Sequence, residues 1–182
     1  MLRLRDILAG VFRAAAAVAE GQRQVALSLQ HQLQTNWCWA ACTSSVSGFY
    51  DPRTTWGQCA IVNAELKQRG CCGGGGSAEC NVPWYLDRAL KRTGNLARKS
   101  DGAASWETVR KEIDAGRPVA ARIGWNGGGG HFVMVTGYRA VGGARDVEVQ
   151  DPWTGSSRIA LDALAQNYKS AGRWTHTYLT RR

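Results

Sequence analysis

Apolar residues follow two different spacings along this chain. Between residues 36 and 116 they recur three and four positions apart, which is the spacing of one helix face. After Pro118 they form short runs separated by glycine-rich turns, which is the pattern of β-strands. Helices first and antiparallel strands second predict an α+β protein whose two lobes, one helical and one of β structure, share a cleft.

Residues that start and stop helices refine this outline. Asn36 is a natural N-cap for the first helix, and Ser105 is one for the fourth. Gly116, followed by Pro118, ends the fourth helix. The expected helices are 37–49, 54–68, 82–91 and 105–115, with a glycine-rich loop at 70–77. The expected strands are 119–123, 132–138, 147–150 and 174–180, with a short helix around 161–168 before the last one.

The N-terminal segment has its own pattern. Apolar residues at helical spacing between Leu4 and Ala19 predict an amphipathic helix that docks on the body like a propeptide or is removed in processing. A degenerate secretory signal and a membrane-surface helix are the alternatives, although Arg13 divides the apolar stretch. We therefore divide the chain into an N-terminal segment, 1–26, and one domain, 27–182.

Composition narrows the class of protein. The chain is 44% hydrophobic, which is enough for a packed core and excludes a disordered tail. No uncharged apolar run approaches the roughly 18 residues of a bilayer span, so we expect no membrane span. The net charge of +9 suggests nucleic acid as a possible partner. Acidic residues are mixed into the basic cluster at 88–111, however, so we interpret this cluster as a solvated face and expect no nucleic-acid partner.

The most informative residue for chemistry is Cys38, at the start of the first expected helix. Free backbone N–H groups and the positive end of the helix dipole stabilise a thiolate at this position. An acyl-transfer site also needs a base, a group that orients the base, and donors for the oxyanion.

Each of these groups has a candidate. His131 begins an apolar strand and is the expected base, and Asp151 ends the next strand in Asp-Pro-Trp-Thr-Gly. If the two strands pair, the carboxylate comes close to the imidazole. Gln32 lies six residues before Cys38 and is the expected oxyanion donor beside the Cys38 N–H. Their rivals are His31, His176 and Gln34, and Asp151 is alternatively only the turn residue of an Asp-Pro sequence.

These segments together resemble the papain-like cysteine peptidases. The resemblance rests on Gln32 ahead of Cys-Trp-Ala at 38–40, on His-Phe-Val-Met-Val-Thr-Gly-Tyr at 131–138, and on the loop at 151–155. It covers roughly residues 27–180 and is closest to the compact bacterial branch, which includes plant-pathogen effector proteases and relatives of the bacteriocin leader peptidases. Asp151 stands where papain itself has Asn, and the short interval from Cys38 to His131 implies that surface loops of the larger enzymes are absent.

The resemblance implies a two-lobed papain-like fold and hydrolysis of peptide bonds through a Cys38–His131–Asp151 triad, a thioester and Gln32. The resemblance implies that this reaction needs no cofactor and no metal. Trp39, Trp153 and Gly130 are the expected substrate-binding residues. The expected partner is a protein or peptide substrate, the expected state is a monomer, and the expected location is outside the cell or inside a host, with the cytoplasm as the alternative.

The remaining cysteines have structural interpretations. Cys42 lies one turn beyond Cys38 and is expected in the core. The other four are expected to form disulfides, with three pairings open and a zinc site as the alternative; they are Cys59, Cys71, Cys72 and Cys80. Two other functions remain open, an amidase or transglutaminase-like acyltransferase with the same triad, and a disulfide- or zinc-stabilised basic binding module.

Overall fold

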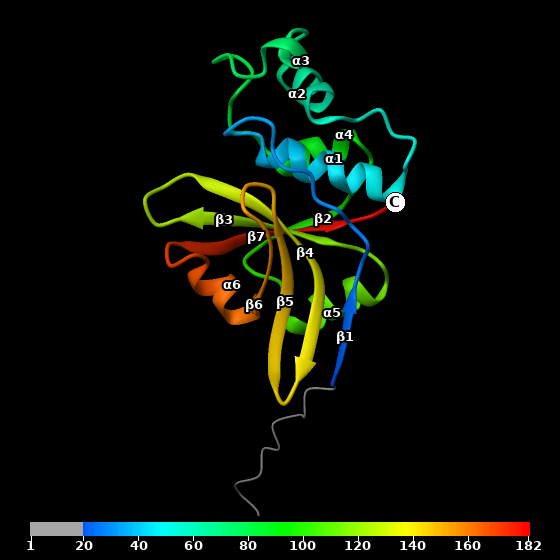
Figure 1. The fold of residues 1–182 in the computed structure, drawn as a ribbon, viewed down its shortest axis with the longest axis vertical. Helices are drawn as coiled ribbons and strands as arrows, with labels where there is room; N and C mark the ends of the chain where they lie inside the picture. The colour runs from blue at the N-terminus through cyan, green and yellow to red at the C-terminus, as the bar shows by residue number, and fades with distance from the viewer. Residues whose placement is uncertain (1–19) are drawn as a thin grey trace, which may run out of the picture.

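A computed structural model describes residues 20–182, and these form a helical lobe above an antiparallel sheet (Figure 1). Four helices make up the helical lobe: α1 (Cys38–Tyr50), α2 (Gln58–Leu66), α3 (Cys71–Gly74) and α4 (Leu86–Arg92). Two further helices, α5 (Trp106–Asp114) and α6 (Leu161–Asn167), flank the sheet. This arrangement confirms the predicted α+β class with two lobes.

The sheet has seven strands in the described part of the chain, and every pairing is antiparallel. The strands are β1 (Gly21–Gln24), β2 (Leu96–Asp101), β3 (Val119–Trp125), β4 (Gly130–Val141), β5 (Ala144–Asp151), β6 (Gly155–Ala160) and β7 (Gly172–Thr180). Their order is β2-β7-β3-β4-β5-β6, and β1 pairs with the second half of β4, where the pairing of β3 with β4 has ended. Helix α1 packs against β4, so the lobes meet at the start of that helix and of that strand.

Several helix ends differ from the sequence expectations. Helix α1 has Trp37 as its N-cap, because the Asn36 side chain is engaged elsewhere and donates from Nδ2 to the Asn81 carbonyl, 2.8 Å away. Helix α4 begins four residues later than predicted: Pro83 disfavours the helical conformation for Val82, and Tyr85 has an extended backbone and is the N-cap. Helix α2 covers only the middle of the expected 54–68, and the glycine-rich loop contains the short helix α3.

Three strands were not predicted from the sequence. β2 and β6 are the two ends of the strand order, and most of their side chains are exposed on both faces, so they lack the alternation that marks a strand. β1 lies within residues 1–26, which we had separated from the domain. The sheet therefore begins at Gly21, while the expected helix between residues 4 and 19 lies outside the described residues.

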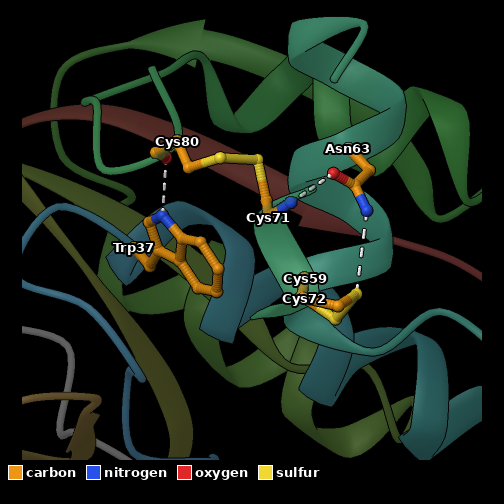
Figure 2. The surroundings of a disulfide bond; sticks show 6 residues. All are labelled: Trp37, Cys59, Asn63, Cys71, Cys72 and Cys80. Atoms are coloured by element: carbon orange, nitrogen blue, oxygen red, sulfur yellow. Dashed lines mark hydrogen bonds between the residues drawn. A yellow bond between two sulfur atoms is a disulfide. The ribbon is translucent and has the colours of Figure 1, made fainter. Parts of the chain in front are cut away.

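Two disulfides hold the glycine-rich loop in place (Figure 2). Cys59 pairs with Cys72 and Cys71 pairs with Cys80, which selects one of the three pairings that the sequence left open. The Cys80 carbonyl accepts a hydrogen bond of 2.8 Å from Trp37 Nε1, immediately ahead of α1. The four sulfurs are therefore bonded to each other rather than available as zinc ligands, and their loop supports the start of α1.

The basic cluster at 88–111 is only partly a solvated face. Arg88 and Arg92 both form ion pairs with the buried carboxylate of Glu65, and Lys99 pairs with Asp87. These ion pairs therefore connect α4 to α2 within the helical lobe and α4 to β2 of the sheet. Within residues 20–182, none of the helices combines the length and the apolar character that a bilayer crossing requires.

Candidate active site

Cys38 is the first residue of α1, and its side chain lines a cleft of about 450 Å³ between the lobes. The ladder of intrahelical hydrogen bonds starts with Ala41 N–H, which donates to the Trp37 carbonyl. The N–H groups before it, including that of Cys38, have no intrahelical acceptor and carry the positive end of the helix dipole. The thiol is therefore placed where an anion is stabilised.

His131 and Asp151 meet across the same cleft. His131 is the second residue of β4 and Asp151 the last residue of β5, and these neighbouring strands pair as the sequence analysis expected. The His131 Nε2 atom lies 2.7 Å from Asp151 Oδ1. Since Nε2 is used in this way, Nδ1 is the ring nitrogen left to face the thiol.

Asp151 is held by more groups than the sequence indicated. Its Oδ1 also accepts from the N–H groups of Trp153 and Thr154, at 2.8 and 3.3 Å. Its Oδ2 accepts from Tyr168 Oη at 2.9 Å and from Lys169 Nζ at 2.7 Å. One carboxylate thus accepts the hydrogen bonds of the Asp-Pro turn and also contacts the imidazole, so the two interpretations of Asp151 do not exclude each other.

The contacts shift the protonation equilibria of this pair in opposite directions. Burial lowers the pKa of His131, but hydrogen bonds to Asp151 and to Cys38 outweigh it and raise the pKa to about 9. Burial raises the pKa of Asp151, yet the hydrogen bond and the charge of His131, together with Lys169, hold that pKa well below its usual range. The favoured state at neutral pH is therefore an imidazolium beside a carboxylate.

Gln32 lines the cleft but is engaged differently from expectation. Its Nε2 donates to the carbonyls of Gln34 and Thr35, both at 2.8 Å, which uses both amide hydrogens. Its Oε1 is buried and has no hydrogen-bond partner among the described residues. In this state Gln32 holds the turn ahead of α1, and the Cys38 N–H has no hydrogen-bond acceptor among the described residues.

The three expected substrate-binding residues have different positions. Gly130 and Trp153 line the cleft, and the Trp153 side chain is half exposed. Trp39 does not line it, because its ring is fully buried and Nε1 donates to the Val82 carbonyl at 3.1 Å. Successive side chains of an α-helix point in directions about 100° apart, so Trp39 lies on a different face from Cys38. Its expected role as a cleft wall is therefore wrong.

The alternative candidates lie outside this constellation. Cys42 is fully buried and its Sγ lies 3.7 Å from the Phe132 carbonyl, as expected for a core thiol. Burial, and then the charges of Cys38 and Asp151, raise the pKa of Cys42, which keeps it protonated. His31 is exposed and stacks on Trp153, and His176 lies on β7.

Three side chains at the site were not found by sequence reasoning. Lys169 and Tyr168 contact Asp151, and Trp125 stacks on the His131 ring with centroids 6.2 Å apart. Trp125 is the last residue of β3, two residues beyond the predicted end of that strand, and the pairing of β3 with β4 brings it near His131. Nothing in the sequence around Lys169 signals its contact, because the turn between α6 and β7 brings it there.

Comparisons with solved structures show the same fold. Digestive procathepsin L 3 from the larval midgut of Tenebrio molitor matches with a TM-score of 0.56 and 15% identity, over 92% of this chain and 72% of that chain. The peptidase domain of Streptococcus ComA, a bifunctional ABC transporter involved in quorum sensing, matches with a TM-score of 0.53 and 16% identity. That match covers 86% of this chain and 99% of the ComA domain.

The sequence itself also matches a family. No curated protein matches the chain significantly. The model of the Peptidase_C39-like family, however, matches residues 24–178, which include every residue of the cleft described above. The chain therefore belongs to the Peptidase_C39-like family and is a papain-like cysteine peptidase.

Proposed function

We propose that this peptidase hydrolyses peptide bonds through a triad of Cys38, His131 and Asp151 and a thioester intermediate. The observation that carries the proposal is the 2.7 Å contact between His131 Nε2 and Asp151 Oδ1, in a cleft that also contains the Cys38 thiol at a helix N-terminus. A nucleophile, a base and a group that orients the base are the parts that covalent acyl transfer requires.

In the first half-reaction, the Cys38 thiolate attacks the peptide carbonyl carbon and forms a tetrahedral intermediate. His131 carries its proton on Nδ1, opposite the Nε2 contact with Asp151. As the intermediate collapses, the C–N bond breaks and the leaving amine takes that proton. The acyl group remains on sulfur as a thioester, and His131 is left neutral.

The developing oxyanion needs hydrogen-bond donors. The Cys38 N–H supplies one, because it precedes the intrahelical ladder of α1. Gln32 supplies the second when its Nε2 exchanges one of its two carbonyl acceptors for the oxyanion. The carbonyls of Cys80 and Val82 accept hydrogen bonds from the indole N–H groups of Trp37 and Trp39, which hold the start of α1 on either side of Cys38.

In the second half-reaction, neutral His131 takes a proton from water as the water oxygen attacks the thioester. The C–S bond breaks, the acid product leaves, and the thiolate–imidazolium pair is restored. Asp151 stays ionised throughout and holds the ring in position. Five donors on its two oxygens keep this carboxylate fixed while the charge on His131 changes.

The test is covalent labelling of the thiol with a papain-type epoxide inhibitor, followed by intact-mass measurement. We expect one adduct on the wild-type protein, none on Cys38→Ala, and a labelling rate at least about a hundredfold lower on His131→Ala. Cys42→Ala is the matched control, because it removes the only other free thiol. Undiminished labelling of Cys38→Ala, or of His131→Ala, would refute the assignment.

We further propose that the substrate is a protein or peptide met in an oxidising compartment, outside the producing cell. The two disulfides support this location, since such bonds persist in oxidising environments and are rare in the reducing cytosol. Disulfide content of protein recovered from culture medium and from cell lysate tests it. Reduced, equally active protein confined to the lysate would contradict it.

A further inference from the structure

A second cleft, of about 560 Å³, adjoins the one that contains Cys38, and the two share Pro83. Its floor is the sheet face that carries Arg122, Phe132, His176 and Tyr178. Arg122 is paired in register with Phe132 on β4 and with His176 on β7, so these side chains share one face. Phe132 directly follows His131, which places this floor beside the catalytic residues.

The wall of the second cleft comes from the helical lobe. Pro83, Trp84 and Tyr85, ahead of α4, face the sheet across it, and the Tyr85 side chain is 59% exposed. The cleft therefore lies between the lobes, like the active-site cleft that it continues. A peptide bound across Cys38 that extends past Pro83 places a side chain in it.

Arg122 is the unusual residue of this cleft. Its Nη1 donates to Thr175 Oγ1 at 2.9 Å and its Nη2 to the Gly129 carbonyl at 3.2 Å. Among residues 20–182, no carboxylate lies within ion-pair distance of its guanidinium. The group is therefore a positioned cation whose charge nothing in the described chain neutralises.

Glycine at position 130 is what allows this placement. A Cβ atom at Gly130 would lie 2.7 Å from Arg122 Nη2 and 2.8 Å from Cζ, so the guanidinium packs directly on the Gly130 backbone. Gly124, its partner in register, is also in contact, since a Cβ there would lie 3.2 Å from Nη1. The two glycines form a shelf for Arg122 next to His131, at the boundary between the two clefts.

Arg122 is the main unpaired positive charge of the second cleft, because the other cationic groups there are paired or largely neutral. Lys99 lines it as well, but its Nζ is paired with Asp87 Oδ1 at 3.2 Å. His176 has Asp101 at 3.5 Å, while burial and then the positive charges of Arg122 and Lys99 lower its pKa, so it adds little charge at neutral pH. Aromatic side chains line much of the cleft around Arg122, and their low polarity strengthens a charge-assisted hydrogen bond to an incoming carboxylate.

We infer that the second cleft binds an acidic side chain of the substrate, on a residue close to the cleaved bond, and that Arg122 selects it. The inference rests on the proposed function, because it assumes that a peptide lies across Cys38. It goes further by stating a substrate class, peptides with Glu or Asp at one position near the cleavage site.

The test is a set of peptides in which each position near the cleaved bond carries Glu, Gln, Phe or Lys in turn. We expect one position at which Glu exceeds Gln about tenfold in kcat/KM, with the ratio falling as salt rises because the cation is partly exposed. Arg122→Met should bring that ratio close to one, by lowering kcat/KM for the Glu peptide much more than for the Gln peptide. Arg122→Glu should favour Lys at the same position.

Arg98→Met is the matched control. It makes the same change of charge on β2, but Arg98 pairs with Leu179 and points to the face opposite that of Lys99. Equal cleavage of Glu and Gln peptides at every position by the wild type would overturn the inference, as would a preference for Phe that Arg122→Met leaves unchanged. Absence of both cleavage and Cys38 labelling would instead overturn the proposed function itself.

If Arg122→Met does not fold, the salt dependence of the Glu-to-Gln ratio in the wild type still decides the matter. A ratio above one that decreases with ionic strength supports a cationic partner, and a ratio independent of salt contradicts it. Arg122→Lys provides a second reading, because it keeps the charge and loses the two fixed contacts. It should retain part of the preference.

Discussion

Lys169 Nζ lies 2.7 Å from Asp151 Oδ2, on the side of the carboxylate opposite His131. The amine also donates to Thr154 Oγ1 at 2.6 Å. Lys169 and Ser170 have φ angles of 50° and 62°, a left-handed conformation that costs about 1–2 kcal/mol per residue in L-amino acids. Despite this cost, the turn places a cation against the carboxylate that contacts His131.

Replacing Lys169 with Met should alter the pH profile as well as the rate. The amine and the imidazolium share one carboxylate, so losing the amine lets the imidazolium hold its proton to higher pH, and the alkaline limb of kcat/KM should move upward. Loss of one anchor of Asp151 should lower kcat by about tenfold or less, since Asp151 keeps its other donors. Lys169→Arg retains the charge and should stay closer to the wild type. A fall in rate with an unchanged profile would assign Lys169 a structural role only.

The alkaline limb of the wild-type profile should reflect His131. Its pKa is raised to about 9, so the imidazolium that protonates the leaving amine is present below that pH and is lost as pH rises through it. The raised pKa also stabilises the fold below the ordinary value near 6.5, and this stabilisation is lost as pH rises through 9. Kinetics and chemical denaturation measured across this range check both effects. A limb near 6.5 would contradict the assigned environment of His131.

Asp151→Ala should lose less activity than Cys38→Ala or His131→Ala, because the carboxylate positions the base and does not contact the reacting atoms. Its alkaline limb should move down toward the ordinary pKa of histidine, since the hydrogen bond and charge of Asp151 are gone. Steady-state kinetics with each variant give both readouts. Equal losses in all three folded variants would show that Asp151 does more than orient the ring.

Gln32→Ala tests whether the amide serves the oxyanion or only the turn ahead of α1. Loss of an oxyanion donor should reduce kcat by about a hundredfold to a thousandfold with little change in KM. Gln34→Ala is the comparison, because Gln34 is the rival glutamine. If both variants lose activity only as far as they lose stability, the two hydrogen bonds of Gln32 Nε2 to the Gln34 and Thr35 carbonyls are its whole function.

The two disulfides should differ in their effect on the nucleophile. Replacing Cys71 and Cys80 with Ser should reduce the free energy of unfolding by about 2–4 kcal/mol and slow the labelling of Cys38, because the Cys80 carbonyl holds Trp37 beside it. Replacing Cys59 and Cys72 removes the other bond, which connects α2 to α3, and serves as the control. It should lower stability with a smaller effect on labelling. Equal effects on labelling would show that general loosening, rather than the contact with Trp37, is responsible.

Gly75→Ala should destabilise the protein through the same tryptophan. A Cβ atom at Gly75 would lie 2.8 Å from Trp37 Cη2 and 3.0 Å from the Cys71 carbonyl oxygen, so the expected cost is about 1–3 kcal/mol. Gly73→Ala, two residues earlier, has no atom within 4 Å of the added carbon and should change stability little. Urea denaturation compares the two variants. Equal stability would show that Trp37 and the loop adjust without cost.

The three residues of the proposed triad could be found from the sequence because local patterns mark them. The start of α1 at Cys38, the strand that begins near His131 and the Asp-Pro turn at Asp151 each follow from short-range preferences that survive in the folded chain. Antiparallel pairing of two consecutive strands then brings His131 and Asp151 together.

Tertiary structure decided what those preferences do not encode. Asn36 has the side chain of an N-cap, yet its contact with Asn81, 45 residues away, leaves the cap to Trp37. β2 and β6 have polar sequences because they are the ends of the strand order, so pairing with a neighbour, and not burial, makes them strands. Lys169 reaches Asp151, and Arg122 lies beside His131, only because distant strands and turns meet. Amino-acid type and local spacing thus determined which groups can react, and long-range packing decided which groups surround them.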